Sequence, residues 1–369
     1  MNFSLNNIRR EKPDSRQIRV TFPQFGNYCV PLEVLFTAGL GVSYVTPPPI
    51  TRRTLEIGSR YSPDYVCAPF KYNLGNYIEA IEAGANLLVQ TGGVCRLGYY
   101  GELHEQILAD LGYNAKFVNM ARAQYDKPLT FYNEFKSVNP DMSLKKIAAV
   151  LPLVLKMVRY IDEAEDYIRH NVGFEKDNGS LERMHKKYLD SLRQVKSKKE
   201  LQRMHKKYMA ELRQVPLERP EKPLRVGIVG EYYTIMEPFS NHYMEKALAD
   251  MGIAVTRWMN LSNSLFVKDQ KLIKDHIRDY AEYNMGATAM NTIDQALRFG
   301  REGYDGIIHV KSFGCTPEMD AMPVLQNISS DFKIPILYFS FDSQTSETGI
   351  QTRLEAFYDM IMMRKEAKG

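Results

Sequence analysis

Apolar segments alternate with amphipathic stretches over the first 120 residues. Four short segments rich in Val, Ile, Leu, Phe or Tyr read as strands: 18–25, 41–50, 85–93 and 115–120. The apolar positions recur with helical spacing in four other segments: 31–38, 52–59, 76–83 and 100–111. Buried strands that alternate with helices are typical of a parallel sheet covered on both faces. The pattern predicts an α/β domain over residues 1–125.

The same alternation returns after the linker PLERPEKP at 216–223. Strands are expected at 224–231, 253–258, 306–315 and 334–342, and helices at 242–252, 267–301 and 352–363. This predicts a second α/β domain over residues 218–369. Ligands of open parallel sheets gather at the carboxyl ends of the strands, so two such domains can share one cleft. The expected fold class is therefore α/β, with two Rossmann-like parallel-sheet domains facing a common cleft and a helical insertion between them.

The insertion, residues 126–217, contains a near-exact duplication. A long helix with one internal proline is expected at 143–170, and it is followed by LERMHKKYLDSLRQV at 181–195 and LQRMHKKYMAELRQV at 201–215. A 20-residue period turns the second copy by roughly 200° around a continuous helix. Either the segment folds back near 196–199 into a hairpin, or each copy faces a different neighbour. We expect His185 and His205, which lie in the repeat, to be surface or packing residues rather than metal ligands.

The length of the chain and the distribution of its charge agree with two domains and a basic insertion. A chain of 369 residues exceeds the usual size of a single core, which agrees with two domains. The net charge is +4, but residues 181–222 alone carry +7 and leave −3 for the rest. The basic segment has no known reading motif for nucleic acid, so a solvated helical face is the better interpretation.

The first residues, MNFSLNNIRREKPDSRQ, are polar, and the chain contains no apolar run long enough to span a bilayer. These features predict a cytoplasmic protein that does not contact a membrane. Thiols stay reduced in the cytoplasm, so a disulfide framework is not expected.

The four cysteines are placed alike, each where a predicted strand gives way to a predicted helix. They are Cys29, Cys67, Cys95 and Cys315, and all but Cys95 carry a proline two residues on. Proline is tolerated in the first helical turn. A helix N-terminus offers free N–H groups and partial positive charge, which stabilise thiolates. The placement favours an iron–sulfur site, with inert buried thiols as the alternative.

Other kinds of site fit the sequence less well. Structural zinc sites usually take cysteines in close pairs, whereas the intervals here are 38, 28 and 220 residues. Gly227 and Gly230 do not complete a dinucleotide fingerprint, and no Walker A motif is present, so ATP hydrolysis would need a partner. We expect His309 to be a core histidine rather than a general acid or base. Glu318 and Asp320 are expected to be first-turn acids that complement the helix dipole.

Several runs resemble a known family. FPQFGNYCVPLEVLF, SPDYVCAPFKYNLGNYIEAIEAGAN, CRLGYYGELHEQILADLGY and HVKSFGCTPEMDAMPVLQNISSDFKIPILYFSFDSQTSETGIQTRLEAF are similar to the acyl-CoA dehydratase activase-related proteins. These are relatives of 2-hydroxyacyl-CoA dehydratase subunits and of the double-cubane cluster proteins. The resemblance covers roughly residues 18–120 and 222–362, and it leaves out the tandem repeat.

The resemblance implies an iron–sulfur cluster in the cleft, with Cys67, Cys95 and Cys315 in the family's cysteine motifs. Where the family motif reads GGCGPCR this chain reads GGVCR, and four cysteines are too few for a double cubane, so a single [4Fe–4S] cluster is expected. Cys29 is either the fourth ligand or a bystander. The resemblance also implies an ATP-hydrolysing activase of the acetate-kinase/sugar-kinase/Hsp70 superfold as partner, and it is compatible with a dimer.

The leading hypothesis for function is an oxygen-sensitive iron–sulfur protein of anaerobic metabolism. It would accept low-potential electrons from the activase and use them on a small substrate such as an acyl-CoA, as a dehydratase-like or ATP-coupled reductase component. The alternative is a non-catalytic electron-transfer or assembly partner that docks through the basic helical insertion. A scaffold that has lost its cluster is the third reading.

Overall fold

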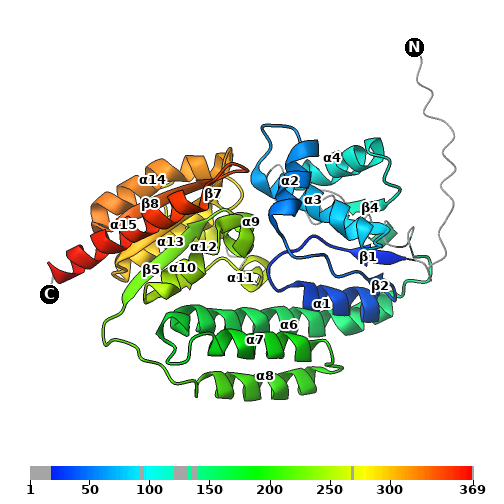
Figure 1. Ribbon diagram of the computed structural model, residues 1–369, viewed down its shortest axis with the longest axis horizontal. Coiled ribbons are helices and arrows are strands. Elements are labelled where there is room, and N and C mark those ends of the chain that lie inside the picture. The colour runs from blue at the N-terminus through cyan, green and yellow to red at the C-terminus, as the bar shows by residue number, and fades with distance from the viewer. Residues whose placement is uncertain are drawn as a thin grey trace, which may run out of the picture.

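Two four-stranded sheets form the centre of the molecule, and every strand pair in them is parallel. The computed structural model describes residues 18–90, 95, 97–119, 132, 133, 136, 139–266 and 270–367. The first sheet has the order β2-β1-β3-β4 and the second the order β6-β5-β7-β8. Both orders are the same pattern, second-first-third-fourth. The α/β fold class with two parallel-sheet domains is confirmed, and Figure 1 shows the two domains side by side.

The first sheet is built of short strands: β1 (Arg19–Thr21), β2 (Ser43–Tyr44), β3 (Leu87–Gln90) and β4 (Lys116–Asn119). Its helices are α1 (Cys29–Val34), the π-helix η2 (Leu35–Gly39), α2 (Arg52–Tyr61), α3 (Ala68–Glu82) and α4 (Leu97–Asp110). One apolar cluster packs η2 against the sheet and another packs α3 and α4 against it. The sheet is thus covered on both faces, as expected for a parallel sheet.

The second sheet has longer strands: β5 (Leu224–Gly230), β6 (Ile253–Arg257), β7 (Gly306–Ser312) and β8 (Ile336–Phe341). One face is covered by α9 (Tyr232–Met236), α10 (Met244–Asp250) and α15 (Glu347–Glu366). The other is covered by α12 (Gln270–His276), α13 (Ala289–Arg301) and α14 (Thr316–Phe332). The short helices η5 (Pro238–Asn241) and α11 (Leu261–Phe266) fill the connections.

The helical insertion begins with α6 (Leu144–Asn171), which contacts η2 and α1 of the first domain and β6 and α11 of the second. Figure 1 shows α6 running beneath both domains, with α7 (Ser180–Leu192) and α8 (Lys198–Leu212) beyond it. A one-turn helix, η4 (Val172–Phe174), follows α6. A single helix therefore supports both sheets.

The tandem repeat forms a helical hairpin, which was one of the two arrangements predicted. Tyr188 and Tyr208 occupy equivalent places in the two copies, and their rings stack at 4.0 Å between centroids. The hydroxyl of each tyrosine lies within hydrogen-bonding distance of the other copy's histidine, His205 at 2.8 Å and His185 at 3.1 Å. Both histidines are therefore packing residues, as predicted.

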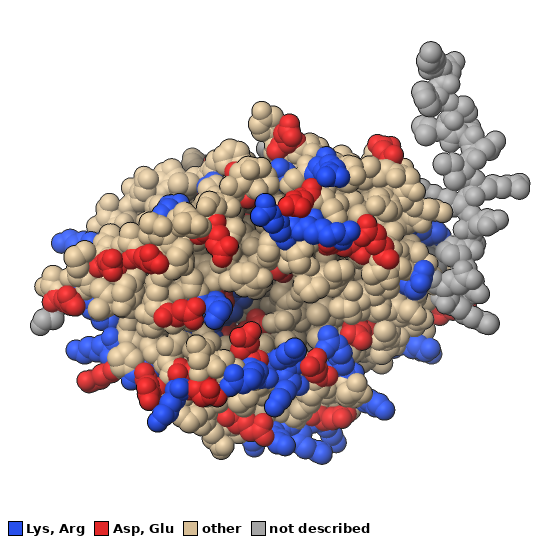
Figure 2. All heavy atoms as spheres, viewed as in Figure 1, with Lys and Arg blue, Asp and Glu red and all other residues tan. Residues whose placement is uncertain are grey.

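The charged side chains of the repeat face away from this core. Lys186, Lys187, Lys206 and Lys207 are exposed. Figure 2 shows basic and acidic side chains intermixed on the face that carries the insertion. No described helix is long and apolar enough to cross a membrane.

Some element boundaries differ from the expected ones. Helix α3 begins directly after Cys67, as the cysteine and Pro69 predicted, so it extends well before the amphipathic stretch 76–83. The helices expected over 267–301 are interrupted between α12 and α13, where Gly286 has φ +79°. Residues 91–93 of the third expected strand and 267–269 of that helical stretch lie outside the described residues. The five-residue helix α9 was not predicted.

Among the described residues, the two α/β domains meet through aromatic side chains and through hydrogen bonds from backbone N–H groups to side chains, one of which runs from Leu261 N–H to the hydroxyl of Tyr28 at 3.1 Å. Phe25 of the first domain stacks on Tyr232 and Tyr233 of the second, at 5.1 and 5.8 Å between ring centroids. The N–H of Ala68 donates to Ser312 Oγ at 2.9 Å, and the N–H of Gly26 donates to Glu237 Oε2 at 3.2 Å. The domains are therefore in direct contact at the carboxyl ends of their strands.

Candidate functional site at the strand ends

Three of the four cysteines lie at the carboxyl ends of the sheets. Cys67 is the N-cap of α3 and Cys315 is the N-cap of α14, both with extended backbone. Cys95 lies between β3 and α4 and is exposed. Two of the thiols therefore stand at helix N-termini, where N–H groups and the helix dipole favour negative charge.

Cys67 interacts electrostatically with each of the other two thiols. Burial raises the pKa of Cys67 to about 11, and the charges of Glu231 and Cys95 add to the shift. The pKa of Cys315 is raised by burial, by Glu231 and Glu318, and by Cys67. Thiols that the sequence separates by up to 248 positions, Cys67 and Cys315, thus share one electrostatic environment.

Polar contacts hold the two helix caps together. Cys67 Sγ and the hydroxyl of Tyr100 on α4 form a hydrogen bond of 2.7 Å. The N–H of Ala68, the first residue of α3, donates to Ser312 Oγ at the end of β7. Since Cys67 and Cys315 flank these two residues closely in sequence, this bond links the two capped helices across the domain boundary.

A buried carboxylate, Glu231, acts electrostatically on two of the thiols, Cys67 and Cys315. Glu231 follows β5 and caps α9, accepting hydrogen bonds from the N–H groups of Tyr233 at 2.8 Å and Thr234 at 2.9 Å. Burial raises the pKa of Glu231, and the hydrogen bonds from Thr234 and Tyr233 oppose that rise. Its charge acts on Cys67, Cys315 and Tyr100. Sequence reasoning missed Glu231 as a site residue, although its position at a strand end could have indicated it.

A second buried carboxylate lies beneath Cys315. Glu318 is completely buried and accepts hydrogen bonds from Thr288 at 2.5 Å and Thr292 at 3.1 Å. Its other oxygen lies 2.8 Å from His309 Nε2, and that side chain is also completely buried. His309 is thus a core histidine, as predicted. Glu318 is more than a first-turn acid, because its carboxylate is enclosed by three partners.

One lysine brings positive charge to the same region. Lys311 on β7 is 7% exposed, and its Nζ donates to Ser340 Oγ at 3.2 Å. Burial lowers the pKa of Lys311, while the charges of Cys315 and Glu318 act in the opposite direction. A buried cation near a thiol favours the thiolate.

Cys29 lies apart from this group. It is the first residue of α1 and packs at the edge of the apolar cluster of α6, α7 and α8. Burial raises its pKa, and the charged groups that act on it are Arg193 and Glu33. The charges that act on Cys29 thus come from the helical insertion and from α1 itself, whereas Cys67 interacts with both Cys95 and Cys315.

Most of this architecture corresponds to a known family. Residues 27–361 match the family 2-hydroxyglutaryl-CoA dehydratase, D-component. The chain belongs to this family. The match covers every strand except β1, together with the helical insertion, and it confirms the resemblance to the acyl-CoA dehydratase-related proteins. No curated protein matches the chain.

Members of the D-component family are generally associated with iron–sulfur clusters. Among the described residues of this chain, no group of three or more His, Cys, Asp or Glu side chains is close enough to hold a metal ion. The donor set nevertheless suits iron and sulfide, because soft thiols come from three loops and two of them stand at helix N-termini. Residues 91–94, next to Cys95, are outside the described residues.

Proposed function

We propose that the protein holds one [4Fe–4S] cluster on Cys67, Cys95 and Cys315. The observation that carries the proposal is the placement of these three cysteines at the strand ends of both α/β domains, two of them at helix N-termini, with electrostatic interactions between Cys67 and each of the other two. When bound, the cluster would store a low-potential electron and offer one iron position without a cysteine ligand. Cys29 is left out of the ligand set because its neighbours belong to the helical insertion.

The protein's own residues would tune this site. The first-turn N–H groups of α3 and α14 would direct positive charge at the cluster, and Lys311 would add to it. Glu231 would oppose them, since its buried carboxylate faces the same thiols. Tyr100, whose hydroxyl bonds to Cys67, would fix the orientation of that ligand.

Family membership supports a dehydratase-like role. The electron would come from an ATP-hydrolysing activase of the acetate-kinase/sugar-kinase/Hsp70 superfold, and it would be used on a small substrate such as an acyl-CoA thioester.

Iron analysis of anaerobically reconstituted protein tests the cluster. We expect about four irons per chain and broad absorption near 400 nm. Cys67→Ser, Cys95→Ser and Cys315→Ser should each lose most of the iron, whereas Cys29→Ser is the matched control and should keep it. The proposal would be wrong if the protein contained less than one iron and about one zinc per chain.

The second candidate function is docking of a protein partner through the helical insertion. The observation in its favour is the outward placement of Lys186, Lys187, Lys206 and Lys207, which the repeat duplicates on both arms of the hairpin. Exchange of these four lysines for glutamate should abolish activase-dependent reduction while the iron content stays the same. An unchanged reduction rate would show that this surface is only solvated.

A further inference from the structure

One loop of the first α/β domain contacts both other parts of the molecule. Residues 25–28 lie between β1 and α1, and each of them has a partner in α6 or in the second domain. Phe25 stacks on Tyr232 of α9 at 5.1 Å between ring centroids. The N–H of Gly26 donates to Glu237 Oε2 at 3.2 Å. All three parts of the chain therefore meet at this loop.

Tyr28, at the end of the loop, joins the three parts through its hydroxyl. The hydroxyl donates to Asp162 Oδ1 on α6 and accepts the N–H of Leu261, the first residue of α11, at 3.1 Å. The other carboxylate oxygen, Asp162 Oδ2, accepts the N–H of Ser262 at 2.7 Å. The first N–H groups of a helix have no acceptor within that helix. The first domain and α6 thus supply acceptors for the start of a helix in the second domain.

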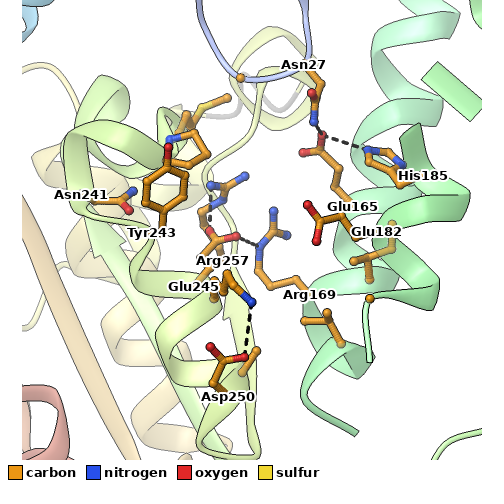
Figure 3. Close-up of a pocket in the computed structure, with 18 of the residues that line it drawn as sticks. Asn27, Glu165, Arg169, Glu182, His185, Asn241, Tyr243, Glu245, Asp250 and Arg257 are labelled. Carbon is orange, nitrogen blue, oxygen red and sulfur yellow. Dashed lines mark hydrogen bonds and ion pairs between the residues drawn. The ribbon is translucent and has the colours of Figure 1, made fainter. Parts of the chain in front are cut away.

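A cavity lies beside these contacts, between the helical insertion and the second α/β domain. Its volume is about 360 Å³, and Gly26, Asn27 and Tyr28 form part of its wall. Figure 3 shows Asn27 at one end of the cavity, where its side-chain amide donates to Glu165 Oε1 at 2.6 Å. On this side the loop is held by individual hydrogen bonds rather than by close packing.

Buried ion pairs fix α6 to the second domain elsewhere along the cavity. Arg169 Nε of α6 donates to Glu245 Oε2 of α10 at 2.9 Å, and Arg257 Nη1 of β6 lies 2.8 Å from Glu245 Oε1. Figure 3 shows the Glu245 carboxylate between the two guanidinium groups. Both arginine side chains are at least 94% buried. The end of α6 and the second domain therefore form one side of a boundary, and the loop forms the other.

Two of the acceptors at this boundary are buried carboxyl groups. Asp162 is 3% exposed and Glu237 is 5% exposed. Burial raises the pKa of Asp162 to about 6 and that of Glu237 to about 7, and hydrogen bonds oppose the rise in each. Water would solvate both carboxylates if the loop left its partners, which offsets part of the loss of hydrogen bonds. Separation at this boundary is therefore less costly than the number of contacts suggests.

Two of the thiols lie at the same domain boundary. Ala68, the residue after Cys67, donates its N–H to Ser312 Oγ of the second domain at 2.9 Å. Cys67 and Cys315 are half-buried, whereas Cys95 is exposed. Separation of the two domains would therefore uncover the first two cysteines and leave the exposure of Cys95 unchanged.

We propose that residues 25–28 form a latch that holds the two α/β domains together and controls access to Cys67 and Cys315. With the loop in place, Tyr28 and Asp162 fix the start of α11 and the two thiols stay covered. When the loop leaves its partners, the domains separate at the carboxyl ends of their strands. Relative motion is the usual behaviour of two domains unless their interface is large and hydrophobic. The latch needs no bound cluster, so it goes beyond the proposed function.

Alkylation of the cluster-free, full-length protein with iodoacetamide at pH 8 tests the latch, with the rate at each cysteine measured by mass spectrometry. Tyr28→Phe removes only the hydroxyl and leaves its two partners without that contact. The loss should raise the open fraction, and with it the rates at Cys67 and Cys315, about fivefold or more. The rate at Cys95 should stay the same.

Two further variants control for the substitution itself. Tyr188→Phe is the matched control, because Tyr188 is equally buried and its hydroxyl lies 2.8 Å from His205 Nδ1 inside the hairpin. It should leave the rates at the two half-buried cysteines unchanged. Glu237→Gln should act in the opposite direction to Tyr28→Phe, since the amide oxygen still accepts from Gly26 and no charge is buried. It should lower both rates severalfold at pH 8.

Hydrogen exchange followed by mass spectrometry gives a second measurement, which is possible with or without a cluster. In Tyr28→Phe the segment that contains Ala68 should exchange about fivefold faster or more, while β7 exchanges as slowly as in the unmodified protein. The proposal is overturned if neither the alkylation rates nor the exchange at Ala68 changes. It is also overturned if β7 accelerates equally, which indicates global unfolding, or if Tyr188→Phe has the same effect.

Discussion

The two α/β domains share a strand order, yet each buries its central histidine with a different partner. In the first domain His104 on α4 lies 2.9 Å from Gln90 Oε1 at the end of β3. In the second, His309 on β7 lies 2.8 Å from Glu318 on α14. Both histidines are completely buried. One pair therefore combines a histidine with a neutral amide, and the other combines it with a carboxylate.

The difference shows which domain contains a buried carboxylate beside its central histidine. A neutral pair needs only hydrogen bonds, and His104 has a second one with the carbonyl oxygen of Phe70 at 3.1 Å. A buried carboxylate needs more support, and Glu318 has two threonines in addition to His309. Glu318 lies one helical turn after Cys315 on α14. The second domain is thus the one built to hold charge at the thiol site.

The largest expected effect is the loss of Glu318. Glu318→Ala would leave His309, Thr288 and Thr292 without their shared partner, and breaking a buried ionic group costs about 3–5 kcal/mol. Gln90→Ala in the first domain removes a neutral partner and should cost about 1–3 kcal/mol. Urea unfolding of the cluster-free protein would measure both free energies.

Asp320→Ala provides the control for that experiment, because Asp320 is an exposed acid on the same helix. It should change the free energy of unfolding by less than about 0.5 kcal/mol. If Glu318→Ala lowers the free energy of unfolding no more than Gln90→Ala does, the two histidine pairs contribute equally to stability. The proposed difference between the domains would then be wrong.

The next effect is the response of the first domain to acid. Burial lowers the pKa of His104 to about 3, whereas an unfolded histidine takes up its proton near pH 6.5. Between these values the unfolded chain binds one more proton, so falling pH destabilises the fold. We expect His104 to account for about 2–3 kcal/mol of the loss between pH 6.5 and 4.5.

Unfolding of His104→Gln at several pH values measures this contribution. The variant should show a shallower loss of stability toward acid than the unmodified protein, whatever its stability at neutral pH. Parallel curves would mean that His104 is already protonated in the fold. NMR titration of the imidazole provides an independent reading of its pKa.

Much of the fold follows from the spacing of apolar residues. The strand segments were predictable because each is a short run of apolar residues bounded by turn signals. The hairpin was predictable as one of two arrangements, because a 20-residue period cannot keep both apolar stripes on one face. Cysteines placed before Pro69 and Pro317 also predicted two helix starts.

The charged parts of the site could not be predicted in this way. Glu231 and Glu318 look like ordinary polar residues near helix starts, and only the packing of α9 and α13 encloses them. The Arg169–Glu245 pair joins residues 76 positions apart on α6 and α10. Periodicity describes one element at a time, whereas these contacts depend on how three elements meet.

Glu237 offers a smaller test at the contact between the domains. Burial raises the pKa of Glu237 to about 7, so the folded protein holds a proton that the unfolded chain releases near pH 4.5. Its stabilising contribution is complete below pH 4.5 and is lost as pH rises to 7. Glu237→Gln imitates the protonated form and should be about 1–3 kcal/mol more stable than the unmodified protein at pH 8.

At pH 5 the same variant should differ little from the unmodified protein, because both side chains are then mostly neutral. Glu218→Gln in the linker is the control, since that carboxylate is 70% exposed. Thermal unfolding at the two pH values gives the comparison. An equal gain at pH 5 and pH 8 would show that protonation of Glu237 does not couple to folding.

The smallest expected effect concerns Cys29. This residue begins the helix that follows β1, and Glu231 is the N-cap of the helix that follows β5, so the two occupy corresponding positions in the two domains. The topological counterparts differ, because Glu231 faces the thiols and Cys29 packs toward α6. Cys29→Ala should cost about 1 kcal/mol by removing a partly buried sulfur from an apolar cluster. Its iron content should equal that of the unmodified protein. A loss of iron as large as that of Cys315→Ser would make Cys29 the fourth ligand and extend the site into the first strand's loop.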